Sequence, residues 1–240
     1  GRVQWLRGLL ATTRGHYGHA LTHYQRARSL FDSQGDQEHR AAVGYLLAEV
    51  HMNLGDTRSA WAQMSESLAL RGDLRDVWRR HTQLLMAGLI SNRAGLYESA
   101  LVFQTLLVDE TLARGNAARQ TEAHLQRAVT WANLGDEQAA RQDIEAAYSV
   151  SRGIEDARLR ESLQADVMVA DGEVRLAHGD AEAVRPLDLA LPALRRERYT
   201  SRLSRLLLAR ARANLLRDNE AAAEADLKEG IALVEQLRDA

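Results

Sequence analysis

The chain has 240 residues, of which 45% are hydrophobic and 27% are charged, and its formal net charge is -2. It has only two prolines and no apolar run long enough to cross a bilayer, which excludes a disordered, fibrous or membrane-spanning chain. The near-neutral charge favours neither nucleic acid nor a membrane surface, and the absence of cysteine excludes disulfides and a cysteine nucleophile. We expect a folded protein of the cytoplasm without nucleic-acid or membrane partners.

A turn that begins with glycine recurs at a constant interval along the chain. It starts at Gly15, Gly55, Gly95 and Gly135, and continues less regularly at Gly179 and Asp218. A regular period of this kind is typical of a solenoid, in which each repeat buries its apolar face by stacking on its neighbours. The sequence therefore predicts one domain of about six repeats, over 1–36, 37–75, 76–116, 117–156, 157–198 and 199–240.

Each repeat is predicted to hold two helices separated by this turn. Glycine takes the left-handed conformation that ends the first helix, and a following aspartate accepts hydrogen bonds from the free amides of the second helix. Asp56, Asp136 and Asp180 stand in this capping position. In the first four repeats the second helix should end near Gly35, Gly72, Gly115 and Gly153. Two helices and two turns leave no room for strands, so the predicted fold class is all-α.

The residues around each turn resemble the tetratricopeptide repeat. That family has a small residue midway in the first helix, glycine at the turn, alanine early in the second helix, then a large and a small residue. In the first repeat these are Gly8, Gly15, Ala20, Tyr24 and Ala27. Their counterparts are Ala48, Gly55, Ala60, Met64 and Ser67; Gly88, Gly95, Ala100, Gln104 and Leu107; and Ala128, Gly135, Ala140, Ile144 and Ala147. The resemblance implies a right-handed α-α superhelix of helical hairpins whose first helices line a concave groove.

The fifth repeat departs from the family pattern. Counting from Gly179 places Val184, Asp188 and Leu191 at the last three packing positions. Pro186 and Pro192 fall inside the predicted second helix, where proline removes an amide donor and clashes with the preceding turn. We expect a bent or divided helix there.

A repeat of about 40 residues resembles the longer subtype of this family. That subtype occurs in bacterial signalling regulators, peptide-sensing proteins, kinesin light chains and repeat arrays attached to caspase-like peptidase domains of the CHAT type. The last helix is predicted over 221–237 with apolar positions Leu227, Ile231, Val234 and Leu237, and the segment 222–238 is similar to the linker repeat before such domains. The chain also begins at Gly1 rather than methionine. We therefore expect a fragment of a larger protein, with an effector domain outside these residues.

The clusters of titratable side chains favour structural roles over catalysis. His16, His19 and His23 have helical spacing but lack a nearby carboxylate ligand, which favours exposed histidines over a zinc site. The acidic pairs Asp143 with Glu145 and Glu220 with Glu224 have the spacing of solvated helix faces and intrahelical ion pairs. No phosphate-binding glycine loop or nucleophile motif is present. We expect a protein that is not an enzyme and that has no cofactor and no metal.

Two arginine clusters, in 71–80 and 195–205, invite a nucleic-acid interpretation. Both are interleaved with acidic residues, and neither is accompanied by regularly spaced aromatic residues on which bases stack. Solvated helix faces and intramolecular ion pairs are favoured. Contact with an acidic partner stays open as an alternative.

The inward positions of the first helices are the candidate binding site. Carried from the family, the candidate peptide-binding residues are Trp5, Tyr45, Glu49, Asn53, Leu85, Asn92, Arg93 and Asn133. A side-chain amide donates and accepts hydrogen bonds at once, so these asparagines can hold a peptide backbone. Alternatives stay open: asparagine near a helix end can simply terminate the helix, and both Trp5 and Tyr45 can be core aromatic residues.

We therefore predict a noncatalytic scaffold that binds a peptide or a protein in the groove of the repeat array. In this interpretation Asn53, Asn92 and Asn133 contact the ligand backbone and Arg93 contacts an acidic group. One alternative is a regulatory or sensor arm of an enzyme, such as a CHAT-type caspase-like protease whose catalytic domain lies outside this chain. Another is an assembly spacer that binds nothing in its groove.

Overall fold

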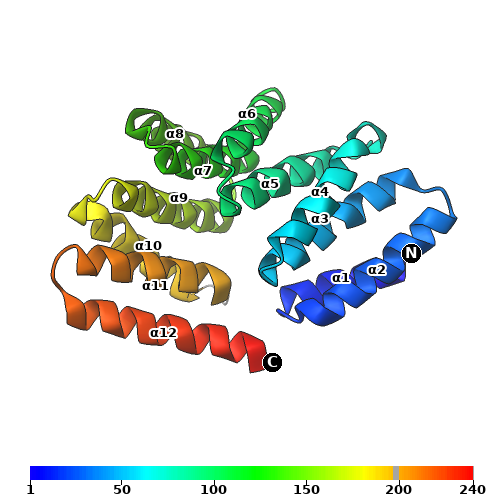
Figure 1. Ribbon diagram of the computed structural model, residues 1–240. Helices are drawn as coiled ribbons and strands as arrows, with labels where there is room; N and C mark the ends of the chain where they lie inside the picture. The colour runs from blue at the N-terminus through cyan, green and yellow to red at the C-terminus, as the bar shows by residue number, and fades with distance from the viewer. Residues whose placement is uncertain (197–199, 240) are drawn as a thin grey trace. The chain divides into compact units, whose positions relative to one another are not determined.

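The structure, a computed structural model, describes residues 1–196 and 200–239 (Figure 1). These residues form twelve α-helices, two short 3-10 helices and no strand, so the predicted all-α fold is confirmed. The α-helices are α1 (Arg2–Thr13), α2 (Tyr17–Ser33), α3 (Gln37–Asn53), α4 (Thr57–Ala69), α5 (Val77–Arg93), α6 (Tyr97–Leu112), α7 (Ala117–Asn133), α8 (Glu137–Ser151), α9 (Ala157–Ala177), α10 (Val184–Arg196), α11 (Thr200–Leu215) and α12 (Glu220–Asp239). The 3-10 helices are η1 (Arg71–Asp73) and η2 (Ala181–Ala183). In the described part of the chain, none of the helices has the length and apolar character needed to cross a membrane.

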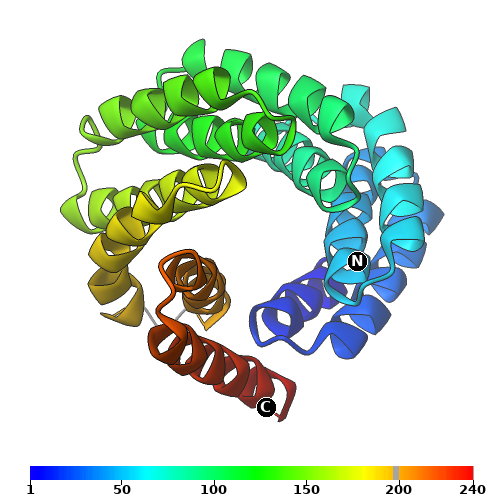
Figure 2. The same cartoon turned by 60° about the vertical axis from the view of Figure 1, so that its left-hand side comes forward.

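The helices pair in chain order as helical hairpins, as predicted for a repeat solenoid. The pairs α1 with α2, α3 with α4, α7 with α8 and α11 with α12 pack side by side, and Figures 1 and 2 show the last of these from two directions. The chain divides into two compact units, residues 1–103 and 104–239, and α6 begins in the first and ends in the second. The single domain with its six ranges stays a prediction.

Left-handed residues end the first helix of each hairpin, as predicted. Five turn glycines have φ between 72° and 84°, namely Gly15, Gly55, Gly95, Gly135 and Gly179. In the last hairpin Asp218 takes this conformation, with φ of 56°. Because an L residue with a Cβ seldom adopts positive φ, these positions mark where the chain must reverse. The predicted stops near Gly72 and Gly153 are also confirmed, since α4 and α8 end at Ala69 and Ser151.

Side-chain caps begin several of the helices, though not α1 and α2. Asp56 and Asp136 accept hydrogen bonds from the amides of Ser59 and Ala139 at 3.0 and 2.9 Å, which confirms the predicted caps. A second series, which the sequence analysis did not single out, begins the first helices of four hairpins at the same regular interval as the turns. Its members are Asp36, Asp76, Asn116 and Asp156. Both series satisfy amides that have no partner inside the helix.

The tetratricopeptide positions lie in the core. Tyr24, Met64 and Leu107 are fully buried, and so are the alanines that accompany them. In the first hairpin, a Cβ added to Gly8 would lie 2.3 Å from the Tyr24 ring, so the two helices touch where only glycine fits. The small residue of the first helix and the large residue of the second therefore fix the hairpin packing.

The packing register of the fifth repeat differs from the prediction. Of the three predicted residues Val184 is buried, but Asp188 is exposed and Leu191 is half-buried. The buried residues near the last two positions are Leu187 and Ala190, each one position earlier than predicted. The reason is η2, because a 3-10 helix has three residues per turn where an α-helix has about 3.6, which rotates the following helix. Leu187 consequently packs on Gly172, where an added Cβ would lie 2.6 Å from it.

The two prolines do not divide the second helix of this repeat. That part of the prediction is wrong, since α10 is continuous through Pro186 and Pro192. Pro186 is the third residue of α10, where the amide has no partner within the helix in any case. Pro192 and Asp188, whose carbonyl loses its partner, are both exposed, so this break in the hydrogen-bond ladder lies on the solvent side of the helix.

Asp143 is buried, which corrects its interpretation as part of a solvated acidic face. It lies three residues after Ala140, on the side of α8 that packs against α7, and is 4% exposed. Arg127 donates to both of its oxygens, at 2.7 and 2.8 Å, and His124 Nδ1 lies 2.7 Å from Oδ1. Burial raises the pKa of Asp143, but the hydrogen bonds from His124 and Arg127 hold it below its usual value.

The same bridge recurs in the last hairpin. Arg210 Nε donates to Asp226 Oδ2 at 2.9 Å, and the two residues have the same separation of 16 as Arg127 and Asp143. By contrast, Glu224 pairs with Lys228 within α12 at 2.6 Å, as predicted for an exposed helix face. The two buried aspartates therefore connect the helices of a hairpin, whereas exposed Glu224 pairs within its own helix.

Replacement of Gly8 by alanine tests the close approach of α1 and α2. Gly8→Ala should lower the free energy of unfolding by about 1–3 kcal/mol, because the new methyl group overlaps the Tyr24 ring. Gly18→Ala in α2 is the control, since no atom lies within 4 Å of its added Cβ, and it should be neutral or slightly stabilising. Urea unfolding measures both, and equal effects would contradict the packing.

Removal of the Asp143 charge tests the buried bridge. Asp143→Asn should cost about 3 kcal/mol at neutral pH, because the Arg127 guanidinium remains partly buried without its counter-charge. The lowered pKa means that the stabilisation is present above the unfolded-state pKa and is lost as pH falls through the folded-state value. The difference between variant and wild type should therefore shrink in acid. A constant difference across a pH series of urea unfolding curves would exclude the ionic contribution.

Candidate functional site

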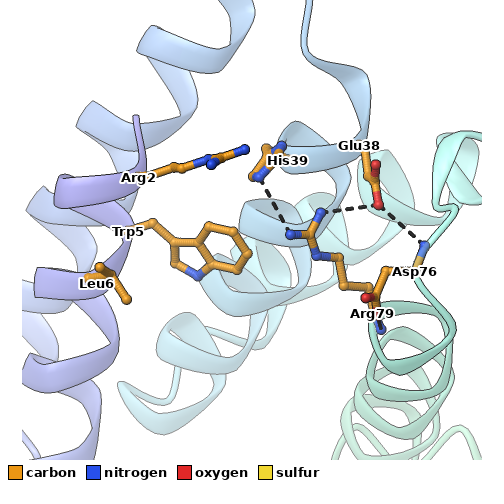
Figure 3. Close-up of a pocket in the computed structure, with 7 residues that line it drawn as sticks. All are labelled: Arg2, Trp5, Leu6, Glu38, His39, Asp76 and Arg79. Atoms are coloured by element: carbon orange, nitrogen blue, oxygen red, sulfur yellow. Dashed lines mark hydrogen bonds and ion pairs between the residues drawn. The ribbon is translucent and has the colours of Figure 1, made fainter.

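A cavity of 490 Å³ opens on the first helices of the first unit (Figure 3). Helix α1 supplies Arg2, Trp5 and Leu6, and helices α3 and α5, with the cap of α5, supply Glu38, His39, Asp76 and Arg79. Of the residues predicted for a binding groove, only Trp5 lines this cavity. The cavity therefore lies nearer the N-terminal ends of these helices than the predicted groove residues do.

The caps of α3 and α5 place the cavity walls. Asp36 accepts a hydrogen bond from the amide of His39 at 3.1 Å, and Asp76 accepts one from the amide of Arg79 at 3.0 Å. Burial raises the pKa of Asp36, but the hydrogen bonds from His39 and the charge of Arg2 hold it below its usual value. Because these caps are one repeat apart, His39 and Arg79 occupy equivalent positions in neighbouring repeats. This spacing is the sequence signal that would have indicated the site.

His39 holds the wall of the cavity by contacts on all sides. Its ring stacks on Phe31 at 4.8 Å and meets Trp5 edge to face at 5.5 Å. Its Nδ1 lies 2.8 Å from Asp36 Oδ2, and its Nε2 lies 3.4 Å from Arg79 Nη2. The imidazole thus joins the cap of α3 to the guanidinium of α5.

Arg79 spans the cavity between an acid and an aromatic ring. Its Nη1 lies 3.1 Å from Glu38 Oε1, and its Cζ lies 5.1 Å from the centre of the Trp5 ring. Glu38 also accepts a hydrogen bond from the amide of Asp76 at 3.3 Å. Figure 3 shows the guanidinium between the indole ring and Glu38. This arrangement satisfies the charge of Arg79 within the protein and makes it a wall residue.

The predicted aromatic residues have different environments. Trp5 is half-buried and packs against the core of the first unit, while its ring also borders the cavity. Its indole nitrogen is shielded from solvent and finds no hydrogen-bond acceptor among the described residues. Tyr45 is 3% exposed, and burial raises its pKa to about 12. Tyr45 therefore lies in the core, as in the alternative interpretation.

Three of the predicted residues form a second feature, which we call the polar strip: Glu49, Asn53 and Arg93. Asn53 and Arg93 are exposed, occupy equivalent positions before their turn glycines, and meet where Arg93 Nη1 donates to Asn53 Oδ1 at 3.4 Å. Glu49 lies one helical turn before Asn53 and is half-buried. The strip therefore combines a carboxylate, an amide and a guanidinium from two adjacent first helices.

The remaining predicted residues, Leu85, Asn92 and Asn133, lie on two different helices. Leu85 and Asn92 are half-buried on α5 in the first unit. Asn133 is exposed at the end of α7, in the second unit. The role of each of the predicted residues in binding stays a prediction.

Arginines of both clusters contact acidic or polar groups of the protein, which confirms the interpretation of these clusters as intramolecular pairs. Arg71 donates to Gln83 Oε1 at 3.1 Å, and Arg195 donates to Glu229 at 2.7 Å. Arg202 donates to Asp166 at 2.9 Å, while Arg205 pairs with Glu173. These four arginines therefore have partners within the protein, whereas phosphate contacts would need arginines that are available to a nucleic acid.

The three N-terminal histidines make separate contacts and do not converge on one point. His23 Nδ1 lies 2.8 Å from Gln4 Oε1, and the rings of His16 and His19 meet edge to face at 6.0 Å. Within residues 1–196 and 200–239, no three His, Cys, Asp or Glu side chains gather in a way that could hold a metal ion.

Comparison with known proteins identifies the fold and shows no closer relationship. No protein-family model and no curated protein matches the chain. A Rap protein complexed with competence and sporulation factor is similar in structure, with 13% identity, a TM-score of 0.65 and coverage of 98% of this chain and 75% of that one. A tetratricopeptide repeat protein from Parabacteroides merdae has 15% identity, a TM-score of 0.59 and coverage of 99% and 85%. A Rap conjugation gene regulator in complex with the Phr* peptide has 13% identity, a TM-score of 0.59 and coverage of 98% and 74%.

These similarities and the buried repeat positions define a tetratricopeptide-like helical repeat fold, as the sequence predicts. Identities this low establish the fold alone. The association with a CHAT-type peptidase stays a prediction.

Loss of the Arg79 side chain tests the construction of the cavity. Arg79→Ala should lower the free energy of unfolding by about 1–3 kcal/mol, because it removes the contact with Glu38 and the cation–π contact with Trp5. Arg75→Ala, at an exposed position of the preceding turn, should change it by no more than about 0.5 kcal/mol. Chemical denaturation followed by tryptophan fluorescence gives both values. Similar values for the two variants would mean that Arg79 does not hold the wall.

Proposed function

We propose that the chain is a noncatalytic scaffold that binds a peptide or an extended segment of a partner protein on the first helices of its first unit. The observation that carries this proposal is the meeting of Asn53 and Arg93, exposed equivalents in neighbouring repeats, at 3.4 Å. An amide of this kind can pair with both the N–H and the C=O of an extended backbone, and the remaining guanidinium N–H groups are suited to a carbonyl or a carboxylate. The ligand would therefore lie across α3 and α5.

Two further observations support this function. Helices α3 and α5 bury their apolar residues in the core and leave Asn53 and Arg93 exposed at their last positions. The cavity bordered by Trp5 lies on the same set of helices and is large enough for a side chain of the ligand. One of the structurally similar proteins is a Rap regulator in complex with the Phr* peptide, and peptide binding by this chain is proposed by analogy with it.

Selection of a displayed library of random peptides against the whole chain tests this proposal. The wild type should enrich a family of related peptides, and Asn53→Ala with Arg93→Ala should weaken the affinity for them at least tenfold, because both contacts with the ligand are lost. Fluorescence anisotropy with a labelled peptide of that family measures the affinity.

The matched control is Gln25→Ala with Arg26→Ala, an exposed amide and an exposed arginine on α2. It should bind as the wild type does, and circular dichroism should show that all three proteins keep their helical content. Absence of an enriched family, or equal affinity of the strip variant, would exclude the proposed function.

A further inference from the structure

Glu49 stands apart from the other half-buried or buried acids of this chain. It lies on α3 between buried Tyr45 and exposed Asn53, one helical turn from each. Among the residues that the structure describes, none donates a hydrogen bond to its carboxylate or forms a close ion pair with it. Arg93 is its charged neighbour, but that guanidinium donates to Asn53 Oδ1 instead.

An unpaired carboxylate in this position is costly to the folded protein. Burial raises the pKa of Glu49, and the attraction of Arg93 offsets only part of this. Asp143 and Asp226, in contrast, are buried with arginines that donate directly to their oxygens. A desolvated charge without such partners is unfavourable unless a ligand supplies the missing counter-charge, so charges of this kind are found most often at functional sites.

The groups around Glu49 do not supply the missing partner. Tyr24 of α2 and Tyr45 of α3 face it as neutral hydroxyls, since burial raises the pKa of each to about 12. The Tyr24 hydroxyl lies 3.2 Å from Thr12 Oγ1 and is engaged there. With Arg93 of α5, these are the titratable and charged groups that act on Glu49 or on which it acts.

We propose that Glu49 binds a basic group of the peptide ligand, a lysine or arginine side chain or an N-terminal amine. This inference rests on the proposed function and names the ligand chemistry of the same surface. A cationic group supplies both the counter-charge and the N–H donors that the carboxylate lacks. The neighbouring Arg93 then meets a carbonyl or an acidic group of the same ligand, so the strip recognises a segment that carries a basic residue.

Binding should depend on pH in a defined direction. A cation binds the ionised carboxylate, so affinity should rise as pH increases through the raised pKa of Glu49 and fall below it. Burial raises the pKa of both neighbouring tyrosines to about 12, so they stay neutral while Glu49 titrates.

The free protein should show the complementary effect. A raised folded-state pKa means that the contribution of Glu49 to stability is full below its unfolded-state pKa and is lost as pH rises through the folded-state value. Glu49→Gln cannot ionise and should therefore unfold at a Tm equal to or above that of the wild type at neutral pH. This measurement also shows that the variant folds.

The experiment compares peptides that the displayed library yields on the wild type at pH 7.5. We expect them to be rich in lysine or arginine, and Glu49→Gln should bind them at least tenfold more weakly. Glu98→Gln, which removes the same charge from an exposed position on α6, should bind as the wild type does. As pH falls from 7.5 through the raised pKa of Glu49, the wild-type affinity should fall, and that of Glu49→Gln should not.

Two results would overturn the role of Glu49 while leaving the proposed function intact. One is an enriched peptide family that needs Asn53 and Arg93 but has no basic residue. The other is equal affinity of Glu49→Gln and wild type for the enriched peptides. A library that yields no peptide at all would remove both proposals together.

Discussion

The close approach of small residues to large ones within each hairpin is the constraint on which the rest of this structure depends. Gly8 packs against Tyr24 and Gly172 packs against Leu187, and neither contact leaves space for a Cβ on the glycine. The two helices of each of these hairpins therefore meet in one register. Interiors packed this tightly resist any other arrangement. The first helix supplies the small residue and the second helix the large one, so both helices of a hairpin take part in this contact.

Two acidic residues, Asp143 and Glu49, show the difference between a carboxylate that stabilises the fold and one that is available to a ligand. Asp143 is buried with an arginine and a histidine that satisfy its oxygens, and it joins two helices. Glu49 is half-buried without such partners, and its pKa is raised where that of Asp143 is lowered. A carboxylate that the fold leaves incomplete is a natural point of contact for a ligand, whereas one that the fold completes is a structural element.

Much of the repeat architecture was predictable because it rests on local chemistry. Glycine at positive φ and aspartate at helix caps act over a few residues, so the turns and helix ends could be assigned from the sequence. The misassigned positions involve longer-range effects. The one-residue shift around Leu187 follows from a 3-10 turn, and the burial of Asp143 follows from its place on the inner face of α8. The cavity residues were missed because their signal is a second series of caps, of which Asp36 and Asp76 are members.

The sequence by itself determined the period, the all-α hairpins and the set of polar residues on the first helices, since these follow from spacing and turn chemistry. Only the tertiary structure decided which of those residues meet. Arg93 contacts Asn53 and Arg79 contacts His39 across a full repeat of chain, between neighbouring hairpins. Tyr45, at the same helical spacing as Glu49 and Asn53, is withdrawn into the core. Partners so distant in sequence are selected by how the helices pack, because packing sets the distances over which side chains can pair.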